Sequence, residues 1–300
     1  MKIVVTGGSG FIGRSLLPRL AAHHHDVTLL TRNAMAVPSL PGMRSEQWDG
    51  KTIGRWAGCL DGADAVLNLA GESIGGRRWT PAQKDRILRS RVDATIAVCE
   101  GIRQAGRKPA TLVSASAVGI YGPVDQGDVP EDHPRGNTFL ADVVDRWETA
   151  AREAEKSGVR VVLVRIGVVL GRGGALKRMM VPFRMFVGGP VGSGNQWFPW
   201  IHIDDLVNVL TMALKDAGLS GPINAVAPHT VTMREFSREL GRALHRPSWI
   251  SLPGFVLRAA LGEMAGMLLT GQKVIPSVLG KRGFDFKYPR LPEALADLAR

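Results

Sequence analysis

KIVVTGGSGFIG, residues 2–13 of a 300-residue chain, joins a short β-branched strand to a glycine cluster and the start of an apolar helix. This order is typical of the βα turn that binds a dinucleotide. One glycine allows the tight turn, another lets the backbone approach a pyrophosphate, and a third lets helix and strand pack closely. The free N–H groups and the positive dipole end of the helix would face the phosphates. We therefore expect cofactor contacts from this turn, at Gly7, Gly10, Phe11, Ile12 and Gly13.

The next apolar run, residues 27–32, indicates which dinucleotide binds. It reads VTLLTR and is expected to be the second strand of the βαβ unit. An NAD site usually places an acidic residue about 20 residues past the glycines, where it holds the ribose 2′-hydroxyl. Here Thr31 and Arg32 stand at that place. A guanidinium can hold a 2′-phosphate by charge-assisted hydrogen bonds, so the sequence predicts NADP(H). The alternative is that Arg32 is a solvated loop residue.

Strand-like and helix-like stretches alternate through the first half of the chain. Strands are expected at residues 63–70, 111–116 and 159–165, and helices from Thr80 to about Gly106 and from Phe139 to about Lys156. Thr80 to Gln83 also has the form of a capping box with proline at the first helical position. This alternation predicts an α/β fold, a Rossmann-type doubly wound parallel sheet. Ligands sit at the carboxyl ends of such strands, so cofactor contacts are also expected at Leu69, Ala70 and Gly71.

The alternation stops after about Gly171. Residues 188–199 are rich in glycine and proline and are expected to form a loop, and Thr232 to Glu235 has the form of a second capping box. We expect residues 1–171 to form the NADP-binding domain, with later segments returning to it. Residues 172–300 would form a small helix-rich C-terminal lobe that binds substrate.

Composition limits the partners and the compartment. The chain carries a formal net charge of +11, but its basic residues are dispersed and no nucleic-acid motif is present, so no nucleic-acid partner is expected. No apolar run approaches a membrane span of ~20 residues, and the first strand leaves no room for a targeting peptide, so no membrane partner is expected. Cys59 and Cys99 form no disulfide framework and no metal motif, which favours a reducing cytoplasm and no metal site.

Several segments together resemble the extended short-chain dehydrogenase/reductase superfamily, which includes sugar-nucleotide epimerases. They are the glycine turn, Ser114-Ala115-Ser116 followed by Ile120-Tyr121-Gly122, and residues 200–205. More narrowly, the chain resembles an atypical epimerase-like subfamily whose members are described as nucleoside-diphosphate-sugar epimerases or cell-division-inhibitor-like proteins. The segments that carry this narrower resemblance are 68–74, 78–80, 90–92, 165–171, 188–194, 271–276 and 283–284. The resemblance implies a further cofactor contact from Arg91; the alternative is an exposed helix charge.

The resemblance also implies a tyrosine and a lysine four residues apart on one helix, and this dyad is absent. The corresponding helix, from Phe139, contains no tyrosine and no lysine before Lys156. Ser116 can take the role of the serine that polarises the substrate oxygen, and Tyr121 is the candidate substitute acid. Three hypotheses follow. In the first, the protein is an NADP-dependent oxidoreductase or epimerase that acts on a small polar substrate, for which a nucleotide sugar is one candidate. In the second, it senses NADP(H) and acts through a partner, and in the third it is a catalytically silent scaffold.

Overall fold

The computed structural model describes residues 1–33 and 40–299. Its centre is a seven-stranded sheet with the strand order β11-β7-β5-β4-β1-β2-β3, in which every neighbouring pair is parallel. The predicted Rossmann-type fold is confirmed. The strands are β1 (Lys2–Thr6), β2 (Asp26–Thr31), β3 (Met43–Gln47), β4 (Ala65–Asn68), β5 (Thr111–Ala117), β7 (Arg160–Ile166) and β11 (Gly221–Ala225).

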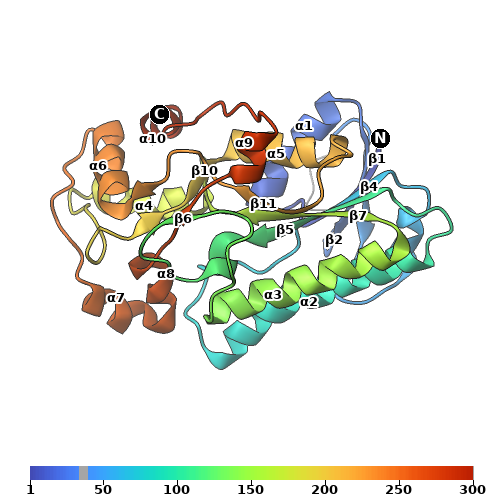
Figure 1. The fold of residues 1–300 in the computed structure, drawn as a ribbon, viewed down its shortest axis with the longest axis horizontal. Helices are drawn as coiled ribbons and strands as arrows, with labels where there is room; N and C mark the ends of the chain where they lie inside the picture. The colour runs from blue at the N-terminus through green and yellow to red at the C-terminus, as the bar shows by residue number, and fades with distance from the viewer. Residues whose placement is uncertain (34–39, 300) are drawn as a thin grey trace.

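Helices cover both faces of the sheet (Figure 1). Helices α1 (Phe11–Ala22) and α5 (Ile203–Lys215) pack together on one face, and α2 (Pro81–Gln104) and α3 (Phe139–Arg152) lie side by side on the other. Alternation along β1 explains the two layers, because Ile3 and Val5 join the core under α1 while Val4 joins the core under α2.

One predicted helix cap is only half formed. The Thr80 side chain accepts a hydrogen bond from the Gln83 N–H, as a capping box requires. The second bond of the box is absent, because the Thr80 N–H donates to the Arg78 carbonyl oxygen at 3.0 Å, and the Gln83 side chain donates to Glu72 Oε1 at 3.4 Å. The second predicted box is confirmed, since Thr232 and Glu235 exchange both bonds at the start of α6 (Met233–Leu244).

The C-terminal part is helix-rich, as expected. A separate core there includes Phe183, Phe198, Trp200, Phe236 and Leu295. Its helices besides α5 and α6 are α4 (Gly174–Arg184), α7 (Gly254–Leu261), α8 (Gly266–Leu269), α9 (Ser277–Lys281) and α10 (Leu291–Leu298). Short strands pair as β8 (Val168–Leu170) with β10 (Trp200–His202), β9 (Trp197–Phe198) with β12 (Val231–Thr232), and β6 (Asp128–Val129) with β13 (Lys273–Val274). Four 3₁₀ turns complete the described elements: η2 (Arg55–Leu60), η3 (Val118–Tyr121), η4 (Glu153–Ser157) and η5 (Gly262–Ala265).

Three late elements return to the sheet. Strand β11 pairs with β7, and α5 and α9 contribute to the same core as β1. The buried Asp205 carboxylate, in the first turn of α5, ties in the C-terminal segment by accepting the N–H groups of Lys287 and Tyr288 at 2.8 and 3.0 Å. We propose that these three elements belong with residues 1–171 and that the rest of 172–300 forms the substrate lobe.

Within the described residues, no helix is both long and apolar enough to cross a membrane. The same residues contain no group of three or more His, Cys, Asp or Glu side chains that could hold a metal ion.

Candidate cofactor and catalytic site

The strand order reverses between β1 and β4, and the glycine turn lies at this point. A crevice outside the carboxyl ends of the strands at such a reversal is where open α/β sheets bind ligands. Gly7 has a φ of +69°, and a Cβ there would lie 2.4 Å from the Leu69 carbonyl oxygen at the end of β4. Only glycine therefore lets the turn pass this close to the neighbouring strand end.

Gly13 brings the first turn of α1 against Gly8. A Cβ on Gly13 would lie 2.3 Å from the Gly8 Cα, which leaves no room for a side chain. The helix N-cap is Gly10, which has no side chain to occupy the helix end, and the first turn carries no acidic residue. The N–H groups of the first turn have no intrahelical acceptors, so this end of α1 suits a phosphate.

Phe11 is held by a second glycine turn that the sequence analysis did not identify. A Cβ at Gly171, Gly173 or Gly174 would lie 2.7, 3.2 or 3.1 Å from the Phe11 ring. The GRGG run of residues 171–174 was the available signal. This turn follows β8, so it fixes the first residue of α1 from the C-terminal half of the chain.

Arg32 follows the last residue of β2 and is exposed. Thr31 is buried, and its hydroxyl accepts a hydrogen bond from the Asn33 N–H at 3.3 Å. The end of β2, residues 31–33, thus presents a cation and no carboxylate. This arrangement fits a cofactor with a phosphate on its ribose better than one with a free 2′-hydroxyl.

Buried hydrogen bonds fix the end of β4, where Leu69 and Ala70 were predicted to contact the cofactor. The Thr6 hydroxyl donates to Asn68 Oδ1 at 2.7 Å and accepts the N–H groups of Leu69 and Ala70 at 3.1 and 3.2 Å. Asn68 in turn donates to the Thr95 hydroxyl on α2 at 2.8 Å. These bonds hold the backbone of Leu69 and Ala70 at the edge that faces the crevice.

Arg91, on α2, lies beside the residues that follow β4, where cofactor contacts were predicted. Its guanidinium donates to the carbonyl oxygens of Ile87 and Glu72 at 3.0 and 2.9 Å, and its Cζ would be 3.2 Å from a Cβ on Gly71. Burial lowers the pKa of this guanidinium to about 10, although Glu72 opposes the shift. A partly desolvated cation beside the crevice is stabilised by an incoming anion.

Ser116 belongs to a buried ionic network. Its hydroxyl, at the carboxyl end of β5, donates to Glu148 Oε1 on α3 at 2.5 Å. The Glu148 carboxylate also receives Arg165 Nε and Nη2, at 2.8 and 2.9 Å, in a two-pronged ion pair. Burial alone would lower the pKa of Arg165, but Glu148 and Tyr121 raise it overall. Neither Glu148 nor Arg165 was predicted from the sequence as a site residue.

Tyr121 lies at the other end of the same network, where it is hydrogen-bonded to Arg165. Its hydroxyl donates to Asn224 Oδ1 at 2.7 Å and accepts from Arg165 Nη1 at 2.9 Å. The side chain is 1% exposed, and burial raises the pKa of its hydroxyl against the opposing effect of Arg165. The structure links Ser116 and Tyr121 through Glu148 and Arg165 but does not bring both hydroxyls to an open pocket.

Other carboxylates of α3 point away from Ser116. Asp142 and Asp145 are exposed or half-buried and both pair with Arg135, at 2.7 and 2.6 Å. Near η3 the helix presents apolar side chains, because Leu140 would contact a Cβ on Gly119 and Val144 packs in the cluster that contains Tyr121. Glu148 is thus the titratable side chain of α3 that contacts Ser116.

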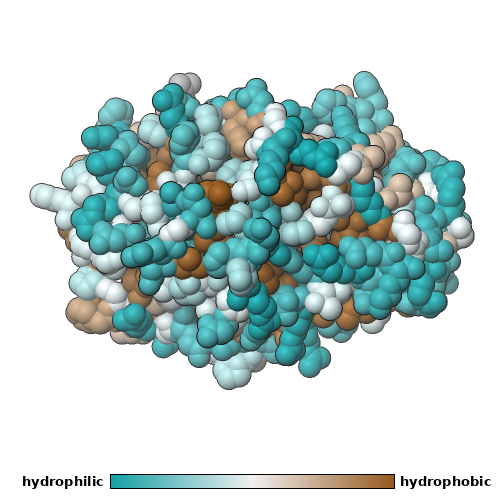
Figure 2. All heavy atoms as spheres, viewed as in Figure 1, coloured by the Kyte–Doolittle hydropathy of each residue, from teal (hydrophilic) through white to brown (hydrophobic). Residues whose placement is uncertain are grey.

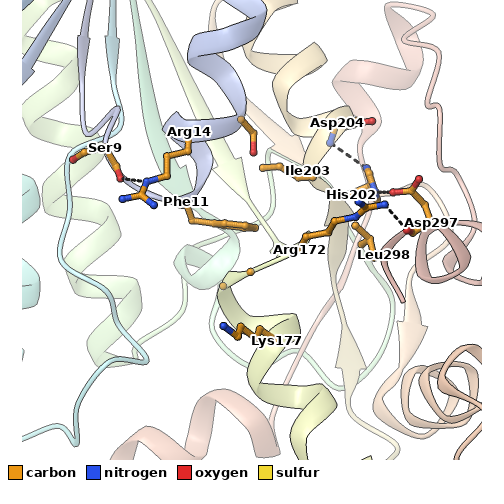
Figure 3. Close-up of a pocket in the computed structure, with 13 residues that line it drawn as sticks. Ser9, Phe11, Arg14, Arg172, Lys177, His202, Ile203, Asp204, Asp297 and Leu298 are labelled. Carbon is orange, nitrogen blue, oxygen red and sulfur yellow. Dashed lines mark hydrogen bonds and ion pairs between the residues drawn. The ribbon is translucent and has the colours of Figure 1, made fainter. Parts of the chain in front are cut away.

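A pocket of about 730 Å³ borders the outer side of the glycine turn (Figure 3). Arg14, Arg172 and Lys177 line it, and Arg14 Nε donates to the Ser9 carbonyl oxygen at 3.0 Å. At its far end the buried His202 ring lies 3.5 Å from the Asp297 carboxylate. Phe11 of the glycine turn lines this pocket, whereas Arg32 and Ser116 do not.

Comparison with known proteins gives a consistent result over the whole chain. Residues 3–225 match the model of the NAD dependent epimerase/dehydratase family, and residues 252–298 match a domain of unknown function, DUF1731. A chloroplastic homologue of epimerase family protein SDR39U1 from Arabidopsis thaliana is 44% identical, over 98% of this chain and 86% of the relative.

Two solved structures are also similar. Human epimerase family protein SDR39U1, crystallised with NADPH, is 41% identical with a TM-score of 0.89, covering 100% of this chain and 99% of that one. A nucleoside-diphosphate sugar epimerase from Corynebacterium glutamicum is 33% identical with a TM-score of 0.80, covering 100% of this chain and 58% of that one.

Proposed function

Because the chain belongs to the NAD dependent epimerase/dehydratase family, we propose that it binds NADP(H) and transfers hydride to or from a small polar substrate. Binding of NADP(H) is supported by the glycine cradle of Gly7 and Gly13, the uncapped start of α1 and the cation at the end of β2. The structure of the human relative with NADPH supports the same cofactor.

In this proposal the cofactor lies along the crevice between β1 and β4. Its pyrophosphate faces Phe11, Ile12 and Gly13 at the start of α1, and its 2′-phosphate is held by Thr31 and Arg32. The ends of β4 and α2 complete the contacts, through Leu69, Ala70, Gly71 and Arg91.

Replacing Arg32 with alanine is expected to weaken NADPH binding by about 10- to 100-fold, because a charge-assisted hydrogen bond to the 2′-phosphate is lost. Binding of NADH, which has no 2′-phosphate, should change little. Calorimetric titration of both nucleotides measures the two affinities. Arg44→Ala is the matched control, since Arg44 is an exposed arginine on the next strand. Equal losses for NADPH and NADH in Arg32→Ala would contradict the assignment.

The observation that carries the catalytic proposal is the 2.5 Å hydrogen bond from Ser116 to Glu148. When a substrate hydroxyl is oxidised, Ser116 Oγ accepts its proton and passes its own proton to Glu148. When bound, NADP⁺ would accept the hydride from the carbon that bears this hydroxyl. In the reduction direction the same protons move back, from Glu148 to Ser116 and from Ser116 to the substrate oxygen. Such a relay replaces the absent tyrosine and lysine. Arg165 holds the Glu148 carboxylate in position and favours its charged form, so Glu148 carries the proton only during the transfer.

Tyr121 has a different role in this proposal. Its hydroxyl is occupied by Asn224 and Arg165, so we assign it to positioning Arg165 rather than to donating a proton. The substrate class follows the relative from Corynebacterium, and a nucleotide sugar is the first candidate.

Ser116→Ala is expected to lower turnover by about 10²- to 10⁴-fold, the usual contribution of a proton-transfer group, while NADPH affinity stays unchanged. Turnover is followed by NADPH absorbance over a panel of UDP-hexoses. Ser237→Ala is the matched control, because Ser237 is a similarly buried serine on α6. Unchanged turnover in Ser116→Ala would exclude the relay.

One observation favours a second candidate function, the sensing of NADP(H). Ser116 and Tyr121 are 3% and 1% exposed, and each is already hydrogen-bonded within the protein. A protein that binds the nucleotide tightly but turns over no member of the panel would fit this function.

We also place the protein in a reducing compartment such as the cytoplasm, where its free thiols Cys59 and Cys99 remain unpaired.

A further inference from the structure

Large apolar side chains are exposed in two neighbouring segments of the C-terminal part, residues 181–187 and 249–256. Trp249 and Phe255 are 71% and 73% exposed, and Met185 is 66% exposed. In the described part of the chain, the other exposed large apolar side chains are only Met1, Ile53 and Ile96. The two segments also expose Val181, Phe186, Val187, Ile250, Leu252 and Val256.

Hydrogen bonds hold the two segments side by side. Trp249 Nε1 donates to the Phe186 carbonyl oxygen at 2.9 Å, and the Ile250 N–H donates to the Gly188 carbonyl oxygen at 3.2 Å. Val191 and Leu252 form an isolated parallel bridge. We call this surface, with the following helix α7, the apolar face. In Figure 2 hydrophobic residues reach the surface at the end of the molecule where Figure 1 places α7.

The charge on the apolar face has one sign. The apolar face, residues 181–187 and 249–261, contains Arg184 and Arg258 and no aspartate or glutamate, and Arg246 adjoins it. Glu263, just beyond α7, is paired with Lys84 at 2.7 Å. The Arg246 guanidinium lies over the Phe186 ring, 4.6 Å from its centre, so cation and apolar surface are interleaved. The whole chain carries a net charge of +11. The partner that complements this face is therefore both apolar and anionic.

We propose that the apolar face binds the surface of an anionic lipid bilayer, with the protein lying on the membrane rather than crossing it. This differs from the sequence-based expectation of no membrane partner, which considered only an apolar run long enough to cross the bilayer. Trp249 and Phe255, each exposed by more than two thirds, protrude from the face, and neither of them lines a described pocket. The face therefore suits a lipid surface, into which protruding side chains can insert. Arginines beside inserted aromatic side chains attract anionic headgroups. A second copy of the chain would place arginines against arginines. The inference does not depend on the proposed function.

Co-sedimentation of the full chain with vesicles tests the inference. We expect binding to phosphatidylcholine vesicles that contain phosphatidylglycerol, and weak binding to phosphatidylcholine alone. Phe255→Ser should reduce anionic-vesicle binding by about tenfold, because burial of one aromatic side chain is lost. Arg258→Gln should reduce it by about fivefold. Trp249→Ser gives an independent second variant. Ile96→Ser, on the exposed side of α2, is the matched control and should bind as the unaltered protein does.

Loss of binding in Phe255→Ser and Trp249→Ser, with full binding in Ile96→Ser, supports the proposal. Equal binding to the two kinds of vesicle, or binding to neither, would overturn it. Concentration-dependent dimers that Phe255→Ser abolishes, without vesicle binding, would also overturn it and assign the face to a second copy. Nucleotide affinity measured on the same variants should remain unchanged, which separates this result from any failure of the cofactor site.

Discussion

Replacing Glu148 with glutamine is expected to lower the free energy of unfolding by about 3–5 kcal/mol, the usual cost of removing one partner from a buried ion pair. Arg165 is 8% exposed and donates to both Glu148 oxygens, so the neutral amide leaves its charge buried without a counterion. Ser116 also loses a charged acceptor. Urea denaturation of the two proteins measures the difference.

Glu153→Gln is the matched control for this prediction. Glu153 follows α3 directly, and its ion pair with Lys156 is exposed, so its loss should leave the unfolding midpoint almost unchanged. A double-mutant cycle with Arg165→Met should show strong coupling to position 148. If Glu148→Gln unfolds at the same denaturant concentration as the unaltered protein, the ion pair does not stabilise the fold as described.

Gly13→Ala is expected to reduce NADPH affinity by more than about 100-fold, because it separates α1 from the turn that holds the phosphates. The added methyl would lie 2.3 Å from the Gly8 Cα and from its carbonyl oxygen, and neither backbone atom can move aside alone. The same crowding should cost about 1–3 kcal/mol of stability. Calorimetric titration gives the affinity, and denaturation gives the stability.

Gly280→Ala controls for the general effect of adding a methyl group to a helical glycine. A Cβ at Gly280, in α9, meets no atom within 4 Å, so this variant should bind NADPH normally and be at least as stable as the unaltered protein. If Gly13→Ala binds NADPH as tightly as Gly280→Ala does, the glycine turn is not the phosphate site.

Local patterns in the sequence were enough to predict the sheet. The glycine turn, the β-branched strands and the alternation with helices each depend on residues close in sequence, and the structure confirms the fold that they predicted. The box predicted at Thr80 is only half formed, since the Thr80 N–H donates to Arg78 and the Gln83 side chain donates to Glu72.

The ionic network could not be predicted in the same way, because its members are distant in sequence. Ser116 and Glu148 are separated by 32 residues, and Tyr121 and Asn224 by 103. Two signals were nevertheless present. Glu148 follows Trp147 on the apolar side of an amphipathic helix, and Arg165 interrupts the apolar run VVLVRIG. A charge at an apolar position indicates a buried partner, but only the fold identifies that partner.

A crystal structure of the protein with NADP⁺ tests the central claim most directly. We predict the pyrophosphate at the start of α1, the 2′-phosphate against Arg32, and the reactive face of the nicotinamide open to Ser116, with Ser116 still bonded to Glu148. Nucleotide bound elsewhere, or a nicotinamide ring that meets only the apolar side chains of α3 with Ser116 closed off behind them, would contradict the account.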